Sequence, residues 1–197
     1  MKFTKRLSLS LLFFSCLSSS FSQETYPNEL FKTDSTTWIK EIIKFPLGFA
    51  PNINYQGFED LRFVKAGWGK MDHPEFWSYA FGWYIQTNKK PTQKDIEHNI
   101  KLYYDGLMQA VNKEPTFTVP ETITSFSKKG KNKFIGTIKT HDSFYTKKII
   151  TLNTLVEIAY CTKQNTYALL FRVSVQDFSH EVWQKLNSLK MEKSICY

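Results

Sequence analysis

The sequence lacks the short motifs that assign a chemistry to a chain. It has no HExxH, HxH or CxxC spacing for a metal ion and no GxSxG for a nucleophilic serine. It also has no GxGxxG and no phosphate-binding loop for a nucleotide. These absences leave the catalytic residues unknown and predict neither a cofactor nor a metal site.

Long apolar runs are missing as well. The longest, residues 7–17, is diluted by serines and is shorter than the roughly 20 residues that a membrane-spanning helix needs. Lys2, Lys5 and Arg6 precede this run with no acidic residue among them, and Ser20-Phe21-Ser22 follows it. A positive start, a short apolar run and a small-x-small end are typical of a signal peptide.

We therefore predict that residues 1–22 are a signal peptide and that residues 23–197 form a single exported domain. The domain would lie in the periplasm or outside the cell. Cys16 leaves a second interpretation, in which its thiol is lipidated and the chain is an envelope lipoprotein. Phe13 and Phe14 stand where a lipoprotein signal carries an aliphatic and a small residue.

Charge is modest in the predicted mature chain. Removing three basic residues and no acid lowers the net charge from +8 to +5 over 175 residues. Such a balance predicts no nucleic-acid partner. Aromatic residues make up 16% of the chain, which suits a sheet core or a ligand-binding surface.

Cysteine is scarce, at three residues, of which Cys161 and Cys196 remain after cleavage. An even number in an oxidising compartment favours a disulfide between them. Two unrelated free thiols are the alternative.

Alternation and helical spacing predict nine elements. Three helices are expected, at residues 34–44, 92–111 and 178–189. Six strands are expected, at residues 58–64, 76–86, 122–127, 133–140, 148–160 and 167–175. Because the strands come in runs joined by short turns, the pattern predicts an α+β fold with a single antiparallel-dominated sheet of about six strands covered by about three helices. The long middle helix could make one parallel crossover.

The strand at residues 76–86 alternates most clearly. One face carries large side chains: Trp77, Tyr79, Phe81, Trp83 and Ile85. Small residues occupy the centre of the other face: Ser78, Ala80 and Gly82. The small face would let a helix approach the sheet, and the aromatic face would fill a core or line a pocket.

Several short stretches resemble a family of exported, uncharacterised bacterial proteins. The matching features are Phe49-Ala50-Pro51, Tyr55-x-Gly57, Glu59-Asp60-x-Arg62-Phe63, Gly67-Trp68-Gly69 and Phe76-Trp77-Ser78-Tyr79-Ala80-Phe81. The resemblance covers most of the mature chain and implies export but no activity. At the level of element order, the chain is also similar to PsbP/Mog1-like α/β/α sandwiches.

Polar residues flank Trp68, which lies in the loop before the aromatic strand predicted at residues 76–86. A ligand site is predicted there, with Trp68 as an amphipathic ring presented outward by its flanking glycines. Arg62, Glu59, Asp72 and His73 would supply the orienting polar contacts. The alternative is structural, with Arg62 paired to a carboxylate that holds a loop on the sheet.

Two further interpretations stay open at this point. The carboxylates near Trp68 could serve a hydrolase-type reaction. His73 could join His141 and Asp142 at a metal only if the fold brought them together. The preferred hypothesis is a non-catalytic binding or accessory protein that takes a small molecule or a glycan.

Overall fold

The computed structural model describes residues 28–162 and 164–196, so the predicted signal peptide and Cys16 lie outside the described residues. A single seven-stranded sheet forms the middle layer, in the order β1-β2-β3-β7-β6-β5-β4, and every neighbouring pair is antiparallel. The strands are β1 (Trp38–Lys44), β2 (Gln56–Val64), β3 (Tyr79–Gln86), β4 (Ile123–Gly130), β5 (Lys133–His141), β6 (Ile149–Cys161) and β7 (Thr166–Ser174).

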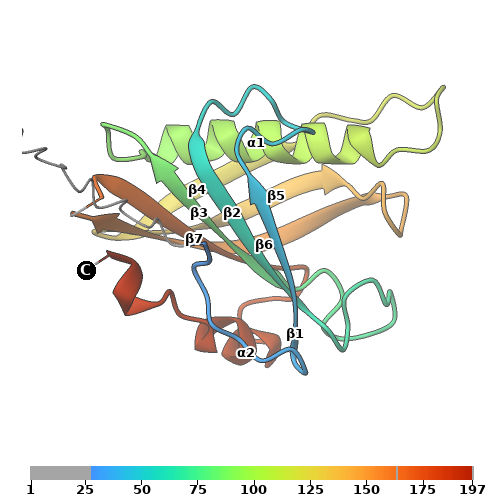
Figure 1. Cartoon of the computed structure of the whole chain (residues 1–197). Coiled ribbons are helices and arrows are strands. Elements are labelled where there is room, and N and C mark those ends of the chain that lie inside the picture. Colours follow the sequence, from blue (N-terminus) through green and yellow to red (C-terminus); the bar gives the residue numbers. More distant parts are fainter. Residues whose placement is uncertain (1–27, 163, 197) are drawn as a thin grey trace, which may run out of the picture.

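Helices cover both faces of this sheet. The helix α1 (Gln93–Ala110) lies along one face, and α2 (Val182–Ser188) lies on the other with the chain that precedes β1 (Figure 1). A short 3₁₀ turn (Lys193–Cys196) ends the described chain. The predicted α+β class and antiparallel sheet are confirmed. The predicted number of elements is wrong, because the described chain has seven strands and two α-helices.

The extra strand comes from residues 34–44, where the predicted helix is wrong. Asp34 does accept backbone N–H groups, from Thr36 and Thr37, but it closes only a single turn. From Trp38 to Lys44 the chain forms β1, and every residue of β1 pairs with a residue of β2. The spacing of the apolar residues fits a helix, yet β-branched isoleucines also suit a strand, and the free edge of β2 supplies the backbone partner.

The helix α1 lies within one residue of the predicted range 92–111 at each end. Thr92 and Asp95 form a reciprocal capping box at its start, and its buried stripe faces the sheet. The helix joins β3 to β4, which point in the same direction but are separated by β7, β6 and β5. The crossover is therefore present, although no two neighbouring strands in the described part of the chain are parallel.

Two cores lie on opposite faces of the sheet. The aromatic face of β3 packs beneath α1 with Leu61 and Phe63 of β2. The small face of β3 receives the chain before β1 rather than a helix, since a Cβ on Gly82 would come within 2.5 Å of Leu30 and 2.9 Å of Phe31. Alternation in β2 and β3 thus assigns each residue to one core or the other.

The C-terminus is tied to the sheet. Cys161, at the end of β6, and Cys196, in the 3₁₀ turn, lie at disulfide distance, with Cα atoms 4.1 Å apart. This placement agrees with the predicted bridge. No helix among the described residues is long and apolar enough to cross a membrane.

Candidate functional site

A cavity of about 300 Å³ opens on the α1 face, at the end of the sheet where β1, β2 and β3 meet the loop around Trp68. Most of its lining is aromatic: Phe49, Phe63, Trp68, Trp77, Tyr79, Tyr103 and Phe144. The remaining lining residues are Glu41, Ile43, Leu61 and Leu107. The cavity therefore offers ring faces to an occupant and few polar groups.

Trp68 reaches this cavity because its loop turns the ring inward. Its backbone N–H donates to the carbonyl of Val64 at 2.8 Å, which closes a turn directly after β2. The ring then packs on Phe63, Trp77 and Tyr79, with centroid distances of 4.4, 5.2 and 5.4 Å. Trp68 is half-buried and forms part of the cavity wall, instead of standing outward as the flanking glycines suggested.

Gly67 and Gly69 are needed for close approach. A Cβ at Gly67 would lie 2.4 Å from the imidazole Nδ1 of His73. Gly69 has a φ of +77°, and a Cβ there would press on Tyr145. The two glycines thus let the loop fold tightly enough to bring Trp68 over the sheet.

Trp77 is the most unusual residue in the wall. Its backbone φ is +51°, a left-handed conformation that side chains as large as tryptophan rarely adopt. The side chain is fully buried, and its indole Nε1 has no hydrogen-bond partner among the described residues. A buried donor without an acceptor is costly, and strained backbone is concentrated at functional sites.

Tyr145 and Phe144 come from the turn between β5 and β6. The carboxylate of Asp142 accepts backbone N–H groups of both residues, at 3.0 and 3.1 Å, and of Thr146 at 2.8 Å. These bonds fix the turn, so that Tyr145 packs edge-on against Trp68. From the sequence, Asp142 is considered only as a metal ligand. An aspartate followed by a short loop is also typical of an Asx-type turn, and that pattern could have predicted its structural role.

Glu59 lies beneath the cavity wall and does not line it. Its carboxyl group accepts the indole N–H of Trp83 at 3.0 Å and faces the hydroxyl of Tyr103 at 3.5 Å. Complete burial raises the pKa of Glu59 to about 8, and these two hydrogen bonds only partly oppose that rise. The carboxyl is accordingly protonated at neutral pH.

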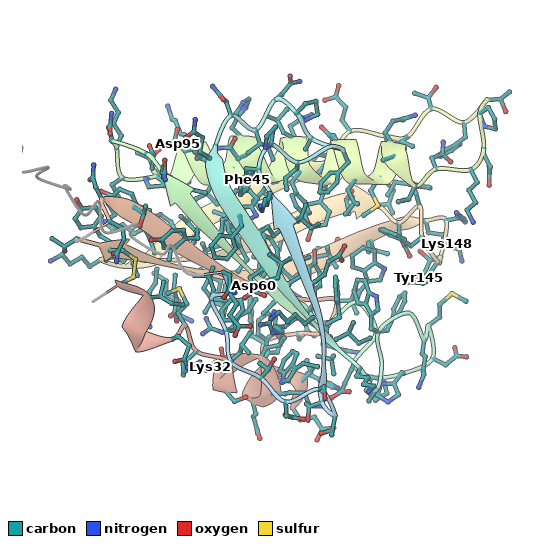
Figure 2. The ribbon with its side chains drawn as sticks, in the orientation of Figure 1. Lys32, Phe45, Asp60, Asp95, Tyr145 and Lys148 are labelled. Atoms are coloured by element: carbon teal, nitrogen blue, oxygen red, sulfur yellow. A yellow bond between two sulfur atoms is a disulfide. The ribbon has the colours of Figure 1, made fainter. Side chains whose placement is uncertain are left out.

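Arg62 belongs to the opposite face. Its guanidinium pairs with Asp60 and donates to the carbonyl of Phe31 at 2.6 Å. Asp60 in turn accepts the backbone N–H groups of Leu30 and Phe31, at 2.7 and 3.2 Å. Figure 2 shows Asp60 near the centre of the molecule and Tyr145 toward one end. The arrangement matches the structural alternative, since the ion pair fastens the chain before β1 onto the sheet.

Asp72 and His73 lie in the loop beyond Trp68, and neither lines the cavity. Asp72 is exposed, and His73 accepts the backbone N–H of Glu75 at 3.1 Å. His141 instead bonds to the hydroxyl of Ser143 at 3.0 Å. No group of three histidine, cysteine, aspartate or glutamate side chains in the described ranges is placed to hold a metal ion.

Of the five predicted ligand-binding residues, only Trp68 lines the cavity. The prediction missed Glu41 and Ile43, because they belong to the segment taken for a helix. It also missed Phe49 and Leu107, which are adjacent to the cavity only in the folded chain. Comparisons with protein-family models, curated proteins and solved structures found no significant match.

Proposed function

We propose that this chain is an exported binding protein without catalytic activity, and that its cavity beneath Trp68 takes a small, largely apolar ligand. The observation that carries the proposal is an aromatic cavity whose wall includes Trp77, a buried residue held in a left-handed backbone conformation. Ligand sites are typically concave and apolar, with a few convergent polar groups.

The shape and chemistry of the wall favour a compact ligand over a glycan chain. Seven rings supply the surface, whereas a sugar needs several hydrogen-bonding groups for its hydroxyls. The hydroxyl of Tyr79 is already bonded to that of Tyr104.

A hydrolase is less well supported by the same geometry. General acid–base chemistry needs titratable groups within hydrogen-bond reach of the substrate. Glu59 lies behind the wall, Asp60 lies on the other face of the sheet and Asp72 is exposed in a loop. Glu41 is the one charged side chain in the described lining.

Export is supported by the N-terminal sequence and by the cysteine pair. The tripartite pattern at residues 1–22 is typical of a signal peptide, and disulfides persist mainly in oxidising compartments. The resemblance to exported bacterial proteins agrees with this placement.

A neutral fluorescent probe tests whether the cavity accepts ligands. N-phenyl-1-naphthylamine should brighten when titrated with the mature protein, because its emission rises in apolar surroundings. Leu107→Trp should abolish this signal, because Leu107 lines the cavity and the larger ring would fill it.

Leu102→Trp is the matched control. Leu102 is another half-buried leucine of α1 that packs on the same core, but it does not line the cavity. It should leave probe binding unchanged. Equal binding by both variants, or no binding by the unmodified protein, would contradict the proposal.

A further inference from the structure

The cavity wall carries charge of one sign. Among the described residues that line it, Glu41 is the single charged one, and none is a lysine, arginine or histidine. Glu41 points to the α1 side of β1, whereas its neighbour Lys40 points to the other side and pairs with Glu29. Within the described ranges, Glu41 itself makes no ion pair.

The negative charge of Glu41 is felt inside the cavity. Burial is the main cause that raises the pKa of Tyr103; Glu59 and Tyr104 contribute next, and the charge of Glu41 adds a smaller part in the same direction. It also contributes to the raised pKa of Glu59, after the larger effect of burial. Both residues stand at or behind the wall, so the field favours a positive group in the cavity.

The aromatic rings add to this preference. Trp68 and Trp77 stand nearly perpendicular, at 73°, and Trp68 and Tyr79 meet at 61°. All three rings line the cavity, so differently oriented aromatic surfaces border the same space. The face of an indole or phenol ring carries negative potential and attracts ammonium groups, most strongly when water is excluded.

We propose that the ligand of this cavity is an organic cation, a small molecule that carries an alkylated ammonium group. The ammonium lies among the ring faces near Glu41. This inference rests on the proposed function, since it names the ligand class of the same cavity.

A pair of isosteric probes isolates the charge. Acetylcholine and 3,3-dimethylbutyl acetate have the same shape and the same ester carbonyl, and differ in a quaternary nitrogen replaced by carbon. Titration of the mature protein, followed by tryptophan fluorescence, should give a dissociation constant for acetylcholine that is at least about tenfold lower. The preference should weaken as salt concentration rises.

Variants locate the source of the preference. Glu41→Gln should weaken acetylcholine binding by about two- to fivefold, the range for one exposed charge, and leave the neutral ester unaffected. Glu114→Gln removes an exposed carboxylate outside the cavity lining and should change neither constant.

The outcomes separate the two proposals. If the neutral ester binds as tightly as acetylcholine, or if neither binds while N-phenyl-1-naphthylamine still does, the cation inference is overturned and the binding function stands. If Glu41→Gln leaves the preference intact, the assigned source of charge is wrong. If the naphthylamine also fails to bind, the proposed function falls with it.

Discussion

Glu59 should make this protein less stable as pH rises from acid to mildly alkaline values. Its carboxyl is fully buried beneath α1, and burial raises its pKa from an ordinary value of 4.5 to about 8. In the unfolded chain the same group ionises near 4.5. Between these two values the native state binds a proton that the unfolded state has released.

The direction and the size of the change in stability with pH follow from this difference in pKa. The contribution of Glu59 is most favourable below pH 4.5, declines from pH 4.5 to about 8, and is constant above that. At about 1.4 kcal/mol for each pH unit, the free energy of unfolding should fall by about 3 kcal/mol by pH 7 and about 5 kcal/mol by pH 8.5.

Glu59→Gln tests this origin. The amide is nearly isosteric with the protonated carboxyl, keeps an acceptor oxygen for Trp83 and offers an N–H group to Tyr103. The variant should match the unmodified protein within about 1 kcal/mol at pH 4.5 and exceed it by several kcal/mol at pH 8.5.

Urea unfolding followed by tryptophan fluorescence at pH 4.5, 5.5, 6.5, 7.5 and 8.5 measures both curves. Glu114→Gln serves as the control, because it removes an exposed carboxyl and should follow the unmodified protein. The difference between the curves isolates Glu59 from Asp60, whose pKa burial also raises. A Glu59→Gln curve that declines as steeply as that of the unmodified protein would refute the reasoning.

Three further predictions concern other parts of the chain. Replacing Cys161 and Cys196 together by alanine should lower the free energy of unfolding by about 3–4 kcal/mol, because the bridge spans 35 residues; two free thiols in unfolded, unreduced protein would contradict it. Trp68→Ala should lower the free energy of unfolding, measured in urea, by about 2 kcal/mol, less than the roughly 3–5 kcal/mol for a fully buried tryptophan. The same variant should abolish naphthylamine binding, and unchanged binding would show that Trp68 is not part of the site. The mass of the secreted protein should correspond to a chain that starts at Gln23, whereas an acylated chain starting at Cys16 would replace the signal-peptide interpretation with the lipoprotein one.

The separation of the predicted ligand residues shows how far strand alternation alone can go. Glu59 and Arg62 are three residues apart, so on any regular strand they face opposite sides of the sheet. Alternation therefore already indicated that Glu59 and Arg62 lie on opposite faces of the sheet and cannot share one site. What it did not provide was the identity of each environment: α1 above Glu59, and the chain at Leu30 and Phe31 beside Arg62.

The error at residues 34–44 has a related cause. Trp38, Ile39, Ile42 and Ile43 satisfy a helical spacing, and Asp34 accepts the N–H groups expected of a cap. A short segment of this kind has little intrinsic preference. Pairing with the open edge of β2 decided its conformation, and that edge exists only once the sheet has formed.

The sequence by itself determined the local properties of this protein. Alternation in β3 assigned its aromatic face, helical spacing predicted α1 near residues 92–111, and the count of cysteines predicted the pairing of Cys161 with Cys196. Each depends on neighbouring residues or on composition. The tertiary structure alone decided that β1 occupies the sheet edge and that Glu41 and Leu107, far apart in the chain, share a cavity with Trp68. A cavity is the space left between packed elements, so no local pattern specifies it.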